Sequence, residues 1–251
     1  MSDVILETRD LAKYFGGVKA VDGVDIHVYR GELLGIIGPN GAGKTTLFNL
    51  ITGFLKPTRG RIIYEGREIQ GMPPSRIALM GIARTFQIVR PFKNLTVFEN
   101  VLTACGYKDY AGLSFIRSWR KDEYLSKAEH LIREVGLEDY SDKPAGTLPL
   151  GHLRRLEIAR ALAIEPKILL LDESMSGMST EEIEEIKTLI RRLRKGGLTI
   201  LLVEHNVPVA VELSDRMYVL NFGKIIAEGK PEEVIHNKEV IEAYLGAGYA
   251  A

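Results

Sequence analysis

The hydrophobic positions of this chain fall in short continuous runs, separated by segments with helical spacing. Leu33–Ile37, Ile168–Leu171 and Thr199–Val203 are largely apolar, and each is followed by glycine or polar residues. Continuous apolar runs of this length are typical of strands buried on both faces of a parallel sheet. Because strands alternate with helical segments along the chain, the pattern predicts an α/β core with a mainly parallel sheet.

One helix between these strands carries signals at both ends. Ser179 and Glu182 have the spacing of a capping box, and Gly196-Gly197 ends the helical pattern. Its apolar face has 3-4-3 spacing and consists of Ile183, Ile186, Ile190 and Leu193. A second helix is predicted over Lys44–Leu55, directly after a glycine-rich turn.

Two regions depart from the α/β pattern. The first sixty residues carry strand and turn signals, and residues 62–69 resemble another strand pair, which predicts an N-terminal antiparallel β subdomain. From about residue 90 to residue 146 the pattern is helical. We therefore expect a single domain, 1–251, in which 1–89 and 147–251 form the core with the β subdomain and about 90–146 form an inserted helical subdomain.

Composition narrows the class of protein. The chain has 251 residues, 45% of them hydrophobic, which suits a folded globular protein. Lys+Arg and Asp+Glu both number 33, so the net charge of zero gives no reason to expect nucleic acid as a partner. The single cysteine, Cys105, is expected to be a packed thiol in a cytoplasmic protein. The longest apolar runs are far shorter than the ~20 residues that span a bilayer.

A glycine-rich segment after the first apolar run matches the phosphate-binding pattern G-x-x-x-x-G-K-[ST] in full. Glycines let the backbone N–H groups wrap a polyphosphate, and the following helix adds its positive end. Lys44 is expected to reach the β- and γ-phosphates, and the Thr45 hydroxyl to ligate Mg²⁺. The predicted nucleotide-binding residues here are Gly38, Pro39, Asn40, Gly41, Ala42, Gly43, Lys44, Thr45 and Thr46.

The second apolar run delivers two carboxylates to the end of its strand. Asp172 is expected to hold Mg²⁺, and Glu173 to activate a water molecule as general base. An acidic strand end is alternatively an exposed terminus of no function. The phosphate-binding loop upstream favours the catalytic interpretation.

Three further elements occur in a characteristic order. Gln87 ends the segment Ile82–Gln87, Leu148–His152 precedes a helix over Leu153–Leu162, and His205 follows the third apolar run. With the phosphate loop and Asp172-Glu173, this order resembles the ABC ATPase family over nearly the whole chain. A soluble ABC protein and a small-molecule kinase are less consistent with one phosphate loop followed by these elements.

The resemblance implies roles for these residues. Gln87 would contact Mg²⁺ or the attacking water, His205 the γ-phosphate, and Phe15 (or, as second choice, Tyr14) would stack on adenine. The signature residues Leu148, Pro149, Leu150, Gly151 and His152 would contact ATP bound by a second ATPase chain. Lys44, Gln87, Glu173 and His205 would form the catalytic set, with Thr45, Gln87 and Asp172 around the metal.

Within the family, several segments are similar to the ATPase subunits of branched-chain amino-acid importers of the LivG type. They are Phe15-Gly16-Gly17, Arg84–Gln87, Arg154–Arg160 and Val240–Gly246. This implies import powered by ATP, transmembrane permease subunits that dock on the helical subdomain, and a peripheral place on the cytoplasmic face of the plasma membrane. A related exporter of the lipopolysaccharide type is the alternative.

The signature departs from the family pattern L-S-x-G-Q at two positions. Pro149 replaces the serine and His152 the glutamine, so a hydroxyl donor to the partner's γ-phosphate is missing. A hydrogen bond to a charged group contributes about 1.5–3 kcal/mol, so one composite site is expected to be weaker by an order of magnitude or more. We therefore expect a heterodimer with a second ATPase rather than a homodimer. The alternative is that backbone N–H groups suffice.

Overall fold

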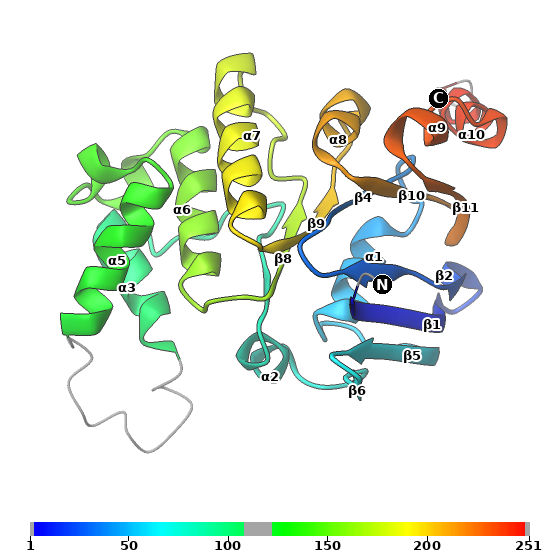
Figure 1. The fold of residues 1–251 in the computed structure, drawn as a ribbon, viewed down its shortest axis with the longest axis horizontal. Helices are drawn as coiled ribbons and strands as arrows, with labels where there is room; N and C mark the ends of the chain where they lie inside the picture. Colours follow the sequence, from blue (N-terminus) through cyan, green and yellow to red (C-terminus); the bar gives the residue numbers. More distant parts are fainter. Residues whose placement is uncertain (1–2, 108–121, 249–251) are drawn as a thin grey trace.

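The computed structural model describes residues 3–107 and 122–248, and it contains two sheets with helices around them (Figure 1). The larger sheet has the order β11-β10-β4-β9-β8-β7, with β11 antiparallel and the other five strands parallel. Its strands are β4 (Leu33–Ile37), β7 (Ile82–Arg84), β8 (Ile168–Asp172), β9 (Thr199–Val203), β10 (Arg216–Asn221) and β11 (Lys224–Gly229). The predicted α/β fold is confirmed.

The smaller sheet is antiparallel and lies at the N-terminal end of the chain. Its order is β2-β1-β5-β6, and β3 pairs with β1 outside this path. Its strands are β1 (Val4–Phe15), β2 (Val18–Val24), β3 (His27–Tyr29), β5 (Arg59–Tyr64) and β6 (Arg67–Glu68). β5 and β6 are the strand pair expected near residues 62–69.

The central strands bury every residue, as their continuous apolar runs predict. Alternate side chains point to opposite faces of a strand. Leu169 and Leu171 join a core with α3, α5, α6 and α7, whereas Ile168 and Leu170 join a core with α1 and the antiparallel sheet. α1 therefore lies between the two sheets, with Ile77 of α2 in the same core, whereas α3, α5, α6 and α7 cover the opposite face.

The helices are α1 (Lys44–Ile51), α2 (Pro74–Leu79), α3 (Val97–Cys105), α5 (Asp122–Glu134), α6 (Leu150–Leu162), α7 (Thr180–Lys195), α8 (Val207–Leu213), α9 (Pro231–Val234) and α10 (Lys238–Gly248). α3, α5 and α6 pack together at one end of the molecule (Figure 1). Part of the predicted helical subdomain, residues 108–121, lies outside the described residues, and the subdomain division stays a prediction.

Two helix boundaries differ from the expectation. α1 ends at Ile51 rather than Leu55, because Gly53 turns the chain with φ +76, and a Cβ there would lie 2.4 Å from the Met72 carbonyl oxygen. α6 begins at Leu150 rather than Leu153, since the extended backbone of Pro149 fits the N-cap position. The capping box of α7 is present in full: Glu182 N donates to Ser179 Oγ, and Ser179 N donates to the Glu182 carboxylate.

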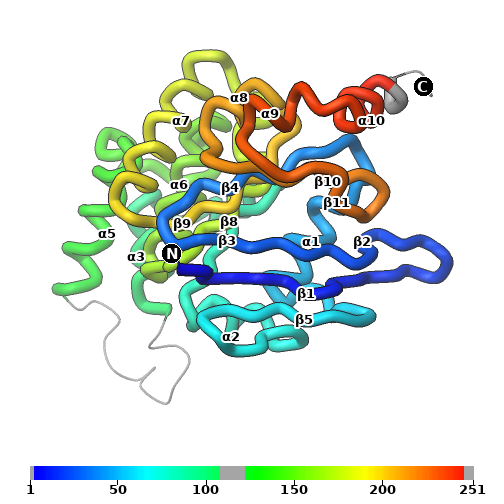
Figure 2. Tube along the Cα trace, turned by 45° about the vertical axis from the view of Figure 1, so that its right-hand side comes forward, coloured from blue at the N-terminus to red at the C-terminus, as the bar shows by residue number. Residues whose placement is uncertain are grey.

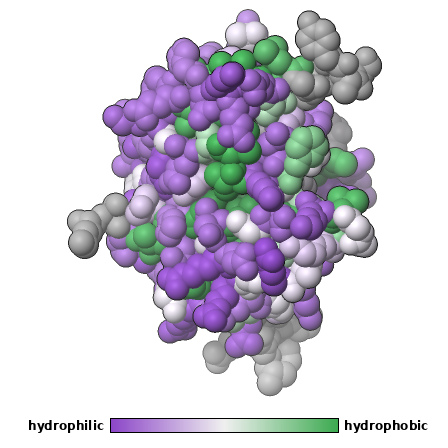
Figure 3. Space-filling view, turned by 90° about the vertical axis from the view of Figure 1, so that its right-hand side faces the viewer, coloured by the Kyte–Doolittle hydropathy of each residue, from purple (hydrophilic) through white to green (hydrophobic). Residues whose placement is uncertain are grey.

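The β10–β11 hairpin lies beside β2, so residues far apart in sequence meet at the open end of the phosphate-binding loop (Figures 1 and 2). The face of the molecule toward this end is mostly hydrophilic, with hydrophobic residues in the centre, at the top and at the right of the view (Figure 3). Among the described residues, no helix combines the length and apolar character needed to span a bilayer. Cys105 is buried, and burial raises the pKa of its thiol to about 11, so it stays protonated as a packed side chain.

Candidate active site

The phosphate-binding loop joins the end of β4 to the start of α1 and is closely surrounded by backbone. A Cβ on Gly38 would lie 2.1 Å from the Leu220 carbonyl oxygen, and one on Gly43 would lie 2.2 Å from that of Ala20. No side chain fits at either position, which explains why the motif requires glycine there. The loop curls around its own lysine: Lys44 Nζ donates to the carbonyl oxygens of Gly38 at 2.6 Å and Pro39 at 3.1 Å.

The charge of Lys44 is set by two opposing effects. Burial lowers the pKa of its ammonium group, whereas the negative charges of Glu173 and Asp172 raise it. The predicted lysine and the two predicted carboxylates are thus close enough to interact electrostatically. Anionic phosphate oxygens arriving in the loop would add to the stabilisation of the ammonium form.

Glu173 is the point at which three predicted catalytic residues meet. Its Oε2 accepts a hydrogen bond from Gln87 Nε2 at 2.7 Å, and its Oε1 lies 2.5 Å from His205 Nε2. The Glu173 N–H donates to the Val203 carbonyl at the end of β9, and its φ of +49 is unusual for a residue other than glycine. Strain of this kind concentrates at functional sites, where the surroundings enforce it. The carboxylate is buried, while the His205 ring is 43% exposed toward the cleft.

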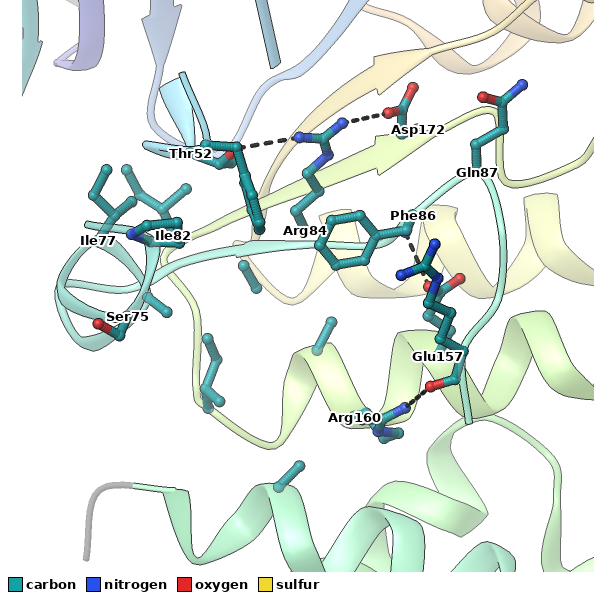
Figure 4. Close-up of a pocket in the computed structure, with 18 of the residues that line it drawn as sticks. Thr52, Ser75, Ile77, Ile82, Arg84, Phe86, Gln87, Glu157, Arg160 and Asp172 are labelled. Atoms are coloured by element: carbon teal, nitrogen blue, oxygen red, sulfur yellow. Dashed lines mark hydrogen bonds and ion pairs between the residues drawn. The ribbon is translucent and has the colours of Figure 1, made fainter. Parts of the chain in front are cut away.

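The partner of Asp172 is Arg84, which sequence reasoning did not identify. Arg84 Nη2 donates to Asp172 Oδ2 at 2.7 Å, and Nη1 donates to Asn49 at 2.7 Å and to Thr52 at 3.2 Å (Figure 4). Both charged groups are almost fully buried, at 6% and 2% exposure. Asp172 Oδ1 is also buried and has no hydrogen-bond partner among the described residues.

The unpaired Oδ1 fits a bound cation, because a buried acceptor without a partner is costly. The Thr45 and Asp172 side chains line the same cavity, which brings a hydroxyl and a carboxylate oxygen, both ligands suited to Mg²⁺, to one place. Gln87, the third predicted metal contact, also lines this cavity, although its amide nitrogen is engaged with Glu173. The residues present therefore fit a magnesium ion.

The signature helix α6 holds the backbone of the Gln87 loop. Arg154 donates through Nη1 to the Phe86 carbonyl at 2.8 Å and through Nη2 to the Gln87 carbonyl at 2.7 Å. Glu157 Oε1 accepts from the Phe86 N–H at 2.9 Å, and its Oε2 lies 3.5 Å from Arg154. Burial raises the pKa of Glu157, and Arg154 opposes that rise. The sequence predicted Arg154 and Glu157 only as part of a helix, because their role depends on the contact between α6 and the Gln87 loop.

The signature residues form the start of α6. Pro149 is the N-cap and provides no side-chain hydrogen bond, while Leu148 is buried and Leu150 is 40% exposed. Gly151 lies against Glu182 on α7, where a Cβ would approach the carboxylate to 2.4 Å. His152 packs on Tyr140 with ring centroids 4.2 Å apart, and burial lowers the pKa of its imidazole. The neutral ring is thus part of the packing around α5 and α6.

The two aromatic candidates for adenine differ in their surroundings. The Tyr14 hydroxyl donates to Asp22 at 2.6 Å, and Lys19 and Arg59 lie close to its ring. The Phe15 ring is 47% exposed, with Lys13 Nζ 5.1 Å from its centroid. Phe15 is therefore the freer of the two rings, and its role in stacking stays a prediction.

A cleft of about 610 Å³ runs over the phosphate-binding loop. It is lined by Gly17 of the β1–β2 turn, Val18–Ala20 at the start of β2, Asn40–Thr46, the predicted catalytic residues Gln87, Glu173 and His205, and Phe222. Gly17–Ala20 and Phe222 were not among the predicted site residues. A cleft of this size accommodates a small ligand. A second, larger cavity of about 840 Å³ opens on the other side of Asp172, between α2, β7 and α6, and we call it the groove (Figure 4).

Comparison with known proteins agrees with this geometry. The model of the ABC transporter family matches residues 21–176, and that of the branched-chain amino acid ATP-binding cassette transporter matches residues 224–250. The branched-chain amino acid transport ATP-binding protein BraF of Pseudomonas aeruginosa is 44% identical over 98% of this chain and 99% of its own length. LivG of Escherichia coli is 42% identical with the same coverage.

Solved structures resemble the fold equally well. An ATP-binding cassette of an ABC transporter in its ADP conformation superposes with a TM-score of 0.87 at 36% identity, covering 97% of this chain and 99% of that one. A dimeric cassette in a post-hydrolysis state, bound to ADP and phosphate, gives a TM-score of 0.78 at 26% identity, covering 90% and 98%. The chain belongs to the ATP-binding cassettes of ABC transporters, whose ATP hydrolysis is coupled to transport. Within that family it is an ATP-binding subunit of the branched-chain amino acid type, together with LivG and BraF.

Proposed function

We propose that this cassette powers the uptake of branched-chain or related amino acids through separate permease subunits. One observation supports ATP hydrolysis by this chain: several predicted site residues meet around Glu173 at the phosphate-binding loop. They are Lys44, Asp172, Gln87 and His205. The cargo follows from the relatives, since BraF and LivG are named as branched-chain amino acid transport proteins.

The residues at the cleft suit hydrolysis of the γ-phosphate. The loop N–H groups and Lys44 bind the β- and γ-phosphates, and Lys44 leaves its two carbonyl partners to do so. A water molecule held by Glu173 attacks the γ-phosphorus while Glu173 accepts its proton. The bond from the γ-phosphorus to the bridging oxygen breaks, giving ADP and phosphate.

The neighbours of Glu173 hold that carboxylate in place. Gln87 and His205 each contact one of its oxygens. A water molecule that binds to Glu173 therefore replaces one of these two contacts. His205 then becomes available for the γ-phosphate. A magnesium ion, held by Thr45 and Asp172 Oδ1 and reached by Gln87, would neutralise charge on the phosphate oxygens.

A second ATPase chain would complete the site, and the signature of this chain would serve the partner's nucleotide. Pro149 offers neither a hydroxyl nor an N–H group, so the start of α6 attracts a phosphate only through its backbone N–H groups and helix dipole. This supports a heterodimer with one weaker composite site. Equal hydrolysis at both sites, after separate lysine substitutions in each chain, would refute the asymmetry.

The groove is the surface we assign to the permease. Exposed apolar side chains lining it include Phe54, Phe86 and Ile88, at 52%, 42% and 67% exposure. ABC cassettes work with membrane subunits, and an apolar depression that reaches from the surface to the Asp172 carboxylate suits a short cytoplasmic helix of such a subunit.

Transport by the assembled complex tests this function. Proteoliposomes that contain the cassette, its permease and a binding component would be loaded with ATP and magnesium, and uptake of labelled leucine, isoleucine and valine measured. We expect ATP-dependent uptake that Glu173→Gln abolishes. Hydrolysis stimulated only by a solute unrelated to these amino acids, with no uptake of the three, would overturn the assignment of the cargo.

A further inference from the structure

Phe222 is an exposed aromatic residue in an unfavourable backbone conformation at the mouth of the nucleotide cleft. Its side chain is 84% exposed, the highest value for a large hydrophobic residue in the described part of the chain. Its φ is +44, a region that bulky side chains rarely adopt. Both features cost stability in the free subunit, and neither is explained by packing within the chain.

The turn that carries Phe222 has a geometry suited to other residues. Asn221 pairs with Lys224 across the β10–β11 hairpin, and the two residues between them, Phe222 and Gly223, both have positive φ. A two-residue hairpin turn of this kind favours Asn-Gly, Asp-Gly or Gly-Gly. Phenylalanine at the first position is therefore a departure from the residue that the turn alone would favour.

Backbone contacts fix this turn to the phosphate-binding loop. Gly223 N donates to the Ala42 carbonyl at 2.9 Å, and the Gly223 carbonyl accepts from Asp22 N at 2.8 Å. A Cβ on Gly223 would lie 2.6 Å from the Lys19 carbonyl oxygen, so β2 and the turn are in close contact. These contacts hold the backbone of the β10–β11 turn, and with it Phe222, next to the phosphate-binding loop and β2. Figure 2 shows the hairpin beside β2.

The cleft has two chemically different parts. Gln87, Glu173 and His205 contact one another and mark the place of the γ-phosphate. The other lining residues outside the phosphate-binding loop are Gly17–Ala20 and Phe222. Val18 and Phe222 offer exposed apolar side chains, and the ammonium group of Lys19 lies 3.4 Å from Asp22. A nucleotide with its γ-phosphate at Glu173 directs its ribose and base away from the catalytic groups, toward this second part.

We propose that Phe222 is a second aromatic contact for the nucleoside part of bound ATP or ADP, acting from the β10–β11 turn opposite the β1–β2 turn. An exposed ring contacts a flat base or a ribose at little cost in side-chain entropy, because the fixed turn already positions it. The backbone strain is retained because the contact with nucleotide compensates for it.

The test uses Phe222→Asn in the full chain, with ADP and inorganic tripolyphosphate as separate ligands in calorimetric titrations. Asparagine suits the turn, so the thermal midpoint of the ligand-free variant is expected to rise by roughly 2–4 °C. The affinity for ADP is expected to fall roughly tenfold, as for loss of an aromatic ring stacked on a base, while the affinity for tripolyphosphate stays within twofold. Phe222→Trp should keep the ADP affinity.

A control variant and the second ligand separate a contact with the nucleoside from an indirect effect on the phosphate-binding loop. Phe92→Ala removes a ring that is 47% exposed and lines neither the cleft nor the groove, and it should leave both affinities unchanged. An unchanged ADP affinity in Phe222→Asn would overturn the proposal. An equal loss for ADP and tripolyphosphate would also overturn it, because Phe222 would then act through the phosphate-binding loop.

Discussion

The pair Arg154 and Glu157 offers the sharpest test of how the signature helix reaches the catalytic site. Arg154→Met keeps much of the side-chain volume but removes both hydrogen bonds to the Phe86 and Gln87 carbonyls. It also removes the ion-pair partner of Glu157, which is 9% exposed, and leaves the more distant charge of Arg160 as the remaining cation near that carboxylate. We therefore expect two separable losses, one in stability and one in catalysis.

The magnitude follows from burial and distance. Removing one partner of a buried ion pair costs about 3–5 kcal/mol, and the 3.5 Å separation of this pair places the loss near the lower end, at about 3 kcal/mol. Since burial already raises the pKa of Glu157, losing Arg154 raises it further. Protonation then relieves the unpaired charge in acid, so destabilisation should be smaller at pH 5.5 than at pH 8.

The assay combines urea unfolding at both pH values with steady-state ATP hydrolysis. Hydrolysis by Arg154→Met is expected to fall about a hundredfold, because small misplacements of a catalytic group, the role predicted for Gln87, have effects of that size. The double variant Arg154→Met/Glu157→Leu removes the unpaired charge and should recover most of the stability but little of the activity. Equal destabilisation at both pH values, or recovered hydrolysis in the double variant, would refute the reasoning.

Three further predictions concern other parts of the chain. Burial raises the pKa of Glu204 to about 7 from 4.5, so the folded state holds this proton to higher pH than the unfolded state. The free energy of unfolding of the wild type should therefore fall by roughly 3 kcal/mol as pH rises from 4.5 past 7. In urea unfolding, Glu204→Gln should lack that fall, and identical pH profiles for the wild type and the variant would contradict the prediction. Pro149→Ser should tighten ATP binding at the composite site about tenfold. Affinity would be measured in the assembled transporter with the other site disabled by a lysine substitution, and an unchanged affinity would show that the backbone N–H groups suffice. Gly151→Ala should displace the Glu182 carboxylate and weaken the α7 cap by about 1 kcal/mol, with a non-additive effect on a Ser179→Ala background; additive losses would place the cost elsewhere.

Local order along the chain was enough to predict which site residues lie close together. The apolar runs that become β4, β8 and β9 bury every residue, and their ends bring Lys44, Glu173 and His205 to one edge of the sheet. Parallel strands make this inference reliable, because their carboxyl ends meet at the same edge. The place of Gln87 in the site was predicted from the order of the motifs along the chain, not from hydrophobic periodicity.

The residues that sequence reasoning missed act through contacts between distant segments. Arg84 was noted only as part of the segment before Gln87, and nothing in its spacing connects it to Asp172. Arg154 and Glu157 were predicted only as positions of the helix Leu153–Leu162, because their role depends on the contact between α6 and the Gln87 loop. The signal for Phe222 was present, since Asn-Phe-Gly-Lys between two apolar runs is a hairpin turn with an unsuitable residue in it.

A pull-down from native membranes tests the central claim most directly. Tagged Glu173→Gln would be purified from detergent extracts with ATP and magnesium, which hold the nucleotide-bound dimer because hydrolysis is blocked. The matched control, Lys44→Ala/Glu173→Gln, should fail to hold that dimer because its phosphate-binding loop is disabled. We expect permease subunits and a second ATPase to copurify with the first variant and the second ATPase to be lost from the control. Recovery of the cassette alone, or only with proteins unrelated to membrane transport, would contradict a transport-coupled heterodimer.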